Sequence, residues 1–344
     1  MRGRPISYQP GDFVVLLVGD SQVEAGTLPR EQMPERLLER ELRERHGIAN
    51  AKVFSVASAG WGTDQELINL RRYFGQHRAD LVLLWFTAVN DFWENGFLDR
   101  SIEAKAGHFK PTFSLAEGAA LKTVQVVPTT KLGLLVEQSR AKLAGLTHAD
   151  WRVRRWQRGL PAASAAQAQT PPECPTRTVE HAKMWDYADV ANATVETHEA
   201  IAINRSHFSP FGKNPSPRER YQIRLTQALL GAVAAEAAAN RAQFRFFYPY
   251  RHDLDGVLAR VSCARTSAAA DSPQFVMGID GNKLIRALDT PALSPHRISY
   301  WLPNTPEISI GKGDIHHNLL GNQLVVKGLA DQLAQQRLLP GTAR

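Results

Sequence analysis

Three short apolar segments, separated by two helical patterns, constrain the fold more than any other feature of the sequence. The apolar segments cover residues 13–18, 53–56 and 81–86, and their length and β-branched content are typical of buried strands. Apolar residues recur at helical spacing through the intervening residues 34–46 and 64–78. This alternation predicts parallel strands joined by right-handed crossovers. We therefore expect an α/β fold, a three-layer αβα sandwich with a mainly parallel central sheet.

The alternation stops near residue 97 and resumes near residue 216. The residues between include an Ala/Gln-rich stretch and a Pro-rich stretch, so we interpret 97–215 as a large insertion or cap, with a helix near 131–145, in a single domain of residues 1–344. Thr63, ahead of the second helical pattern, is the expected N-cap of that helix. The chain beyond the insertion predicts a helix at 216–240, strands at 244–248, 275–279 and 298–302, and a last helix at 319–333.

The charge and cysteine content narrow the function classes. The formal net charge is +7, but the Lys and Arg residues are scattered rather than clustered, so we expect no nucleic-acid binding. Cys174 and Cys263 form no Cys-x-x-Cys pair, which argues against a cysteine-bound zinc ion. A single disulfide and two free thiols are both open.

Membrane and export signals are absent from the sequence as printed. No apolar stretch approaches the ~20 residues that span a bilayer, and residues 1–11 lack an apolar signal segment. We therefore expect no membrane span. The sequence fits a cytoplasmic protein, or a periplasmic or extracellular one whose natural chain has an export segment ahead of Met1.

A serine follows the first predicted strand, in the sequence Gly19-Asp20-Ser21. The carboxyl edge of an open parallel sheet is where such folds build their sites. A serine nucleophile needs a base, and the base needs an orienting group. Near the C-terminus, Asp314 stands just ahead of His316 and His317, and could orient either imidazole. The alternative interpretations are a polar turn at Ser21 and a helix cap in the segment with the histidines.

Two further loops at the same predicted edge offer hydrogen-bond donors. Gly60 follows the second strand and can present its backbone N–H closely, and Asn90 follows the third strand and can supply a side-chain amide. Donors of this kind stabilise the oxyanion of an acyl-transfer intermediate. Simple turn geometry for Gly60 and an Asx turn for Asn90 are the alternatives.

These residues, in this order and spacing, resemble the SGNH hydrolase (GDSL esterase/lipase) superfamily, in particular its bacterial branch. The likeness covers residues 12–96 and about 310–330. It implies the flavodoxin-like SGNH fold and a serine esterase with these roles: Ser21 as nucleophile, a C-terminal histidine as base, Asp314 as its orienting group, and Ser21, Gly60 and Asn90 as the oxyanion hole.

Two positions bear on the details of that resemblance. The family usually has glycine before the Asn-Asp pair, where this chain has Val89. The family pattern Asp-x-His-x-Asn-x-x-Gly selects His316 as the base, with His317, which fits Asp-x-x-His, as the second choice. Asn318 and Gly321 complete the first pattern without a gap.

Other site types fit the sequence less well. The Gly-x-Ser-x-Gly elbow of α/β-hydrolases is absent around Ser21. Gly60-Trp61-Gly62 begins a dinucleotide-type turn, but Gln65 occupies the third glycine position. His316 and His317 could contribute to a metal site, but no third ligand is in view. We therefore expect no metal and no cofactor.

The substrate is less constrained than the reaction. The expected substrate is a small-molecule or polysaccharide acyl ester, with O-acetyl groups on a carbohydrate as the first choice, because the chain is basic. Trp151, Trp156 and Trp185 could be platforms for sugar rings or the core of a cap. The alternatives are an O-acyltransferase acting on a polysaccharide and a non-catalytic carbohydrate-binding protein on the same scaffold.

Overall fold

The computed structural model describes residues 4–95, 112–116, 120–124, 130–146, 217–251, 286–303, 306–310 and 316–341. Its main sheet has five strands in the order β2-β1-β3-β6-β7, and every neighbouring pair is parallel. The strands are β1 (Phe13–Gly19), β2 (Ala51–Ala57), β3 (Leu81–Trp85), β6 (Gln243–Arg251) and β7 (Arg297–Leu302). Counted along the sheet, this is the flavodoxin-like order. The predicted parallel αβα architecture is confirmed.

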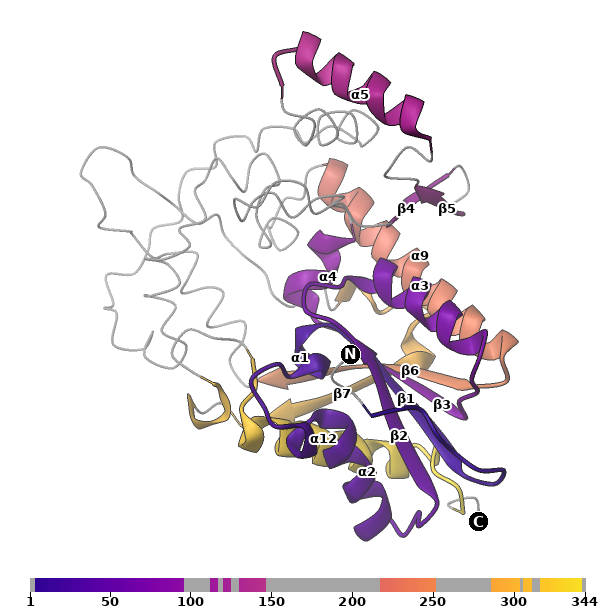
Figure 1. Ribbon diagram of the computed structural model, residues 1–344. Helices are drawn as coiled ribbons and strands as arrows, with labels where there is room; N and C mark the ends of the chain where they lie inside the picture. Colours follow the sequence, from indigo (N-terminus) through magenta and orange to yellow (C-terminus); the bar gives the residue numbers. More distant parts are fainter. Residues whose placement is uncertain are drawn as a thin grey trace, which may run out of the picture.

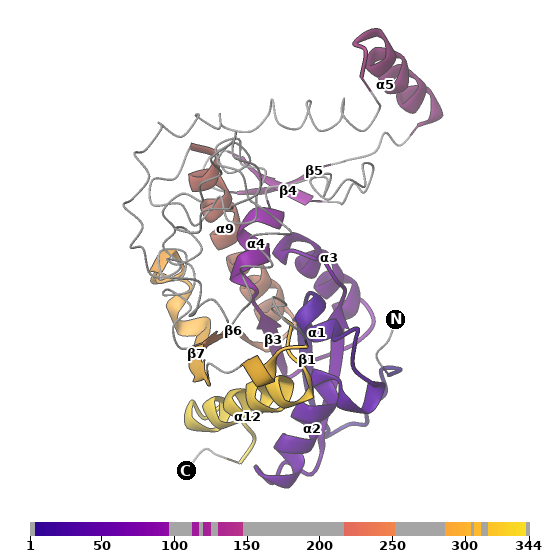
Figure 2. The same cartoon turned by 90° about the vertical axis from the view of Figure 1, so that its left-hand side faces the viewer.

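Helices cover both faces of the sheet (Figures 1 and 2). One face packs against α3 (Thr63–Phe74) and α9 (Pro217–Ala239), and the other against α2 (Pro34–Glu44) and α12 (Leu319–Gln335). Alternate residues of β1 enter the two cores, so that Val14, Leu16 and Val18 lie on the α3 side, and Phe13, Val15 and Leu17 lie on the α2 side. Burial on both faces explains why these strands are continuous apolar runs rather than alternating ones.

Part of the region interpreted as an insertion is described. A separate antiparallel pair, β4 (Thr112–Leu115) and β5 (Leu121–Val124), was not predicted. Helix α5 (Lys131–Leu143) confirms the helix expected near 131–145, and lies at the end of the molecule opposite α2 (Figures 1 and 2). Several features named above lie outside the described residues: the strand expected at 275–279, Trp151, Trp156, Trp185, Cys174 and Cys263.

The start of α3 differs from the prediction by one residue. Thr63 is the first helical residue, and Gly62 is the N-cap. A Cβ at Gly62 would lie 2.7 Å from Oδ1 of Asn95, so a side chain has no room at the cap position. The Asn95 amide oxygen takes over part of the capping by accepting a 3.1 Å hydrogen bond from the Asp64 N–H. The packing of this loop against the end of α4 (Ala88–Glu94) therefore replaces a threonine cap.

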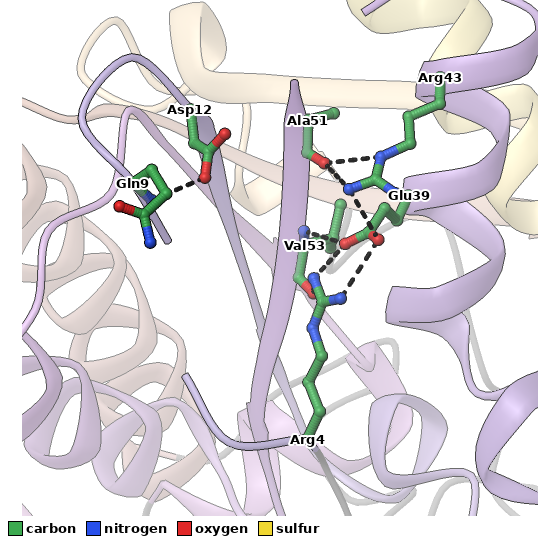
Figure 3. Close-up of polar contacts among 7 residues, drawn as sticks. All are labelled: Arg4, Gln9, Asp12, Glu39, Arg43, Ala51 and Val53. Atoms are coloured by element: carbon green, nitrogen blue, oxygen red, sulfur yellow. Dashed lines mark hydrogen bonds and ion pairs between the residues drawn. The ribbon is translucent and has the colours of Figure 1, made fainter. Parts of the chain in front are cut away.

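Strand β2 is an edge of the sheet, and side chains satisfy its outward backbone groups (Figure 3). Glu39 accepts from the Val53 N–H at 2.9 Å, and Arg4 donates to the Val53 carbonyl at 2.9 Å. Arg43 donates to the Ala51 carbonyl at 2.7 Å, and both arginines form ion pairs with Glu39. An open strand edge is a template for pairing with another chain, and these three side chains occupy it.

Candidate active site

Ser21 lies directly after the carboxyl end of β1, as the first residue of the short helix α1 (Ser21–Glu24). Asp20 is the N-cap, and its Oδ1 accepts from the Gln22 N–H at 2.9 Å. The first N–H groups of a helix have no intrahelical acceptor, which leaves the Ser21 N–H available to a ligand. A Cβ at Gly19 would lie 2.5 Å from Cγ2 of Val23. Glycine at this position therefore lets α1 fold back against the strand end.

His316 reaches Ser21 from the other end of the chain. Its Nε2 lies 2.7 Å from Oγ of Ser21, although the two residues are 295 positions apart. In the tautomer with the proton on Nδ1, Nε2 accepts from the serine hydroxyl. The His316 carbonyl accepts from the Ile310 N–H at 3.1 Å, and the Asn318 N–H donates to the Ile308 carbonyl at 3.0 Å. These bonds hold the histidine segment against residues 308–310.

The adjacent His317 points elsewhere. Its side chain is buried, and its ring packs against the indole of Trp85, with ring centroids 5.8 Å apart. A Cβ at Gly321 would lie 2.9 Å from Nδ1 of His317, which shows how tightly α12 closes over this ring. The structure therefore brings His316, and not His317, to Ser21. Which histidine acts as the base is still a prediction, and Asp314 lies outside the described residues.

The alternative interpretation of the segment with His316 and His317, as a helix cap, is confirmed for a residue next to the two histidines. Asn318 is the N-cap of α12, and its Oδ1 accepts from the Gly321 N–H at 3.0 Å. Its amide nitrogen also donates to the Ser309 carbonyl at 3.0 Å. The buried Asn322 adds donors to the carbonyls of His317 and Asn318. Capping of α12 and placement of His316 thus use different residues of one segment, and neither excludes the other.

Asn90 lies in the first turn of α4, after β3, and is held by Asp20. Its Nδ2 donates to Oδ2 of Asp20 at 2.8 Å. Burial raises the pKa of the Asp20 carboxyl, while hydrogen bonds from the Gln22 N–H and the Asn90 amide, the nearby Thr87 hydroxyl and the charge of His316 offset part of this rise. An amide nitrogen carries two N–H donors. One of them donates to Asp20, which leaves the second for another acceptor.

The role of Asp20 was not anticipated from the sequence. In the sequence, Asp20 stands out only as the middle residue of Gly19-Asp20-Ser21. A signal existed, because aspartate immediately ahead of a helix is a preferred N-cap. The bond to Asn90, in contrast, joins the starts of two helices 70 residues apart in the sequence and has no local sequence signal.

Gly60 lies in a tight turn after β2. The turn spans Ser58 to Trp61, and the Trp61 N–H donates to the Ser58 carbonyl at 3.2 Å. Gly60 has φ +74° at the third position, which is the signature of a type II turn and favours glycine. Ser21, Gly60 and Asn90 thus follow β1, β2 and β3, which are adjacent strands of the sheet, at their carboxyl ends.

Two other features are absent from the described part of the chain. No group of three His, Cys, Asp or Glu residues within it could hold a metal ion. Nor does any helix among those residues combine the length and apolar character needed to cross a membrane.

Comparisons with solved structures give distant likenesses. The chain is similar to the psychrotrophic esterase EstA from Pseudoalteromonas sp., at 10% identity and a TM-score of 0.40, over 95% of this chain and 100% of that one. It is also similar to LAE5, an alpha/beta hydrolase enzyme from the metagenome of Lake Arreo, Spain, at 14% identity and a TM-score of 0.21, over 66% of this chain and 96% of that one. A scan of protein-family models finds no match, and a search of curated proteins finds none. These likenesses are too distant to assign an activity.

Proposed function

We propose that this protein is a serine ester hydrolase of the SGNH type. The observation that carries the proposal is the 2.7 Å contact between Oγ of Ser21 and Nε2 of His316. A hydroxyl and an imidazole at this distance have the spacing that the nucleophile–base pair of acyl transfer requires. Gly60 and Asn90 at the same sheet edge support it, because donors near a nucleophile can stabilise an oxyanion.

The proposed reaction has two stages. Oγ of Ser21 attacks the ester carbonyl carbon while Nε2 of His316 takes the hydroxyl proton, and the oxyanion accepts from the Ser21 and Gly60 N–H groups and the Asn90 amide. The intermediate collapses, and His316 returns the proton to the departing alcohol oxygen. A water molecule then attacks the acyl-serine with His316 as base, which releases the acid and regenerates Ser21. Asp314 is the proposed orienting group for His316. No step requires a metal or a cofactor.

The nucleophile is tested by the release of p-nitrophenol from p-nitrophenyl acetate. We expect the Ser21→Ala variant to lose turnover, because no other group in the mechanism can carry the acyl chain. Ser114→Ala, the same substitution on β4, is the matched control and should retain wild-type rates. Equal turnover in wild type and Ser21→Ala would instead favour a non-catalytic binding protein for this substrate class.

The base is tested by separate His316→Ala and His317→Ala variants. His316→Ala should abolish turnover, since of these two rings it is that of His316 that contacts Ser21. His317→Ala removes a buried ring from Trp85 and should lower the thermal unfolding temperature while turnover continues. Loss of turnover in His317→Ala, with turnover retained in His316→Ala, would overturn the proposed role of His316.

The proposed substrate is an O-acetyl ester on a carbohydrate. The support is the resemblance in sequence and the net charge of +7, which favours an acidic or polysaccharide partner. Acetate release from acetylated glycans should exceed the rates on p-nitrophenyl esters of increasing chain length. A clear preference for long acyl chains would contradict this substrate. Adding a glycan acceptor and measuring its acetylation separates hydrolysis from transfer.

A further inference from the structure

We propose that Glu24 is a positioning residue that holds the Gly60 N–H in place for the oxyanion, an inference that rests on the proposed function. Oε2 of Glu24 accepts from the Ala59 N–H at 2.7 Å. Glu24 is the last residue of α1, the helix that begins with Ser21. Ala59 immediately precedes Gly60. One side chain therefore links the helix of the nucleophile to the turn of the oxyanion donor.

The type of turn explains why such a link matters. Ala59 and Gly60 are the two central residues of the Ser58–Trp61 turn, and Gly60 has φ +74°. The Gly60 N–H belongs to the central peptide unit, whose orientation distinguishes type II from type I turns. Within the turn, the Trp61 N–H bond to Ser58 closes the ends and leaves the central peptide free to rotate. The Glu24 carboxylate anchors the peptide immediately before it, which limits that rotation.

The other end of the link is also fixed. Within α1, the Glu24 N–H donates to the Asp20 carbonyl at 3.0 Å and the Ala25 N–H donates to the Ser21 carbonyl at 3.0 Å. Asp20 in turn binds Asn90. The three proposed oxyanion donors are therefore connected through α1, with Asp20 holding Asn90 and Glu24 holding the Gly60 turn. Donor placement affects the rate because the oxyanion forms only in the transition state.

The test compares two variants that lack the acceptor with one that keeps it. Glu24→Ala and Glu24→Met remove the carboxylate, and Glu24→Met retains the length of the side chain. Glu24→Gln keeps an acceptor oxygen. We expect kcat to fall by roughly tenfold to a hundredfold in the first two, since a misplacement of ~1 Å can cost about that much, and to recover largely in Glu24→Gln. KM should stay nearly constant, because the donor acts on the oxyanion and not on the bound ester.

Controls separate this inference from the proposed function. Glu31→Ala removes an exposed carboxylate from the neighbouring turn η1 (Arg30–Gln32) and should leave kcat unchanged. Thermal unfolding measurements identify any variant that fails to fold. If Glu24→Ala does not fold, the kcat of Glu24→Met tests the role of Glu24 instead. Wild-type kcat in Glu24→Ala, or equal losses in Glu24→Gln and Glu24→Met, would overturn the role of Glu24. If Ser21→Ala retains full turnover, the proposed function itself fails, which is a different result.

Discussion

Replacing Asp20 with asparagine should lower turnover without unfolding the protein. Asp20 is fully buried, and each of its two oxygens accepts one bond, from the Gln22 N–H at 2.9 Å and from the Asn90 amide at 2.8 Å. Asparagine has one acceptor oxygen and one NH₂ group. It can cap α1 or hold Asn90, but not both, because its NH₂ group would face a second donor.

The expected fall in kcat follows from the hydrogen bond that Asn90 loses. Asparagine caps helices about as well as aspartate, so we expect the cap to persist and the bond to Asn90 to break. Loss of one oxyanion donor typically costs about 10²–10³ in kcat, or ~2.7–4 kcal/mol, and Asp20→Asn should approach that range. Stability should change less, because the substitution also removes a carboxylate whose pKa is raised by burial.

The assay is steady-state hydrolysis of p-nitrophenyl acetate by Asp20→Asn, Asn90→Ala and the double variant, with thermal unfolding of each. If both residues act through the same donor, the double variant should be no slower than Asn90→Ala alone. Asp12→Asn, which changes a carboxylate that accepts from the Gln9 N–H ahead of β1 (Figure 3), is the matched control. Losses that multiply in the double variant, or unchanged kcat in Asp20→Asn, would refute the reasoning.

Two further predictions concern stability. Gly321→Ala would drive a Cβ into the Ile308 carbonyl oxygen, and should lower the free energy of unfolding by about 1–3 kcal/mol; Gly231→Ala in α9, where nothing lies within 4 Å, should stabilise by up to ~1 kcal/mol. A thermal unfolding temperature that moves the same way in both variants would contradict this. Burial raises the pKa of Glu35 above its ordinary value, and the charges of Arg36 and Arg4 offset only part of the rise. Its contribution to stability is therefore full below the ordinary pKa and is lost as pH rises through the raised one. Glu35→Gln should accordingly raise the unfolding temperature at pH 8 and gain little near pH 4, and a gain independent of pH would oppose this assignment.

The fold was predictable because its signals are local and repeated. The run from Phe13 to Val18 is apolar at every position, since β1 faces a core on both sides, and such runs between helical patterns define a parallel sheet. The topology then places Ser21, Gly60 and Asn90 at one edge without further information. The pair β4 and β5 escaped prediction because each strand has four residues, too few for a periodicity to emerge.

The details of the site depend on contacts that no local pattern encodes. His316 and His317 are neighbours, and side chains alternate between faces along extended backbone. One ring therefore meets Ser21 and the other meets Trp85. Residue types and their order do not determine which of the two neighbouring rings faces Ser21. Only the likeness to a family pattern favoured His316. The links from Asp20 to Asn90 and from Glu24 to Ala59 likewise depend on how segments far apart in the sequence pack together.

The helix that closes one side of the core follows directly after the proposed base. Val325, Leu329 and Leu333 of α12 are buried in the same core as Leu38 and Leu42 of α2. Release of α12 from this core would carry the His316 segment away while the serine stays on β1. Local opening of a terminal helix costs less free energy than global unfolding. Heat inactivation should therefore precede the loss of the sheet, and enzyme activity would report on the docking of the C-terminal helix.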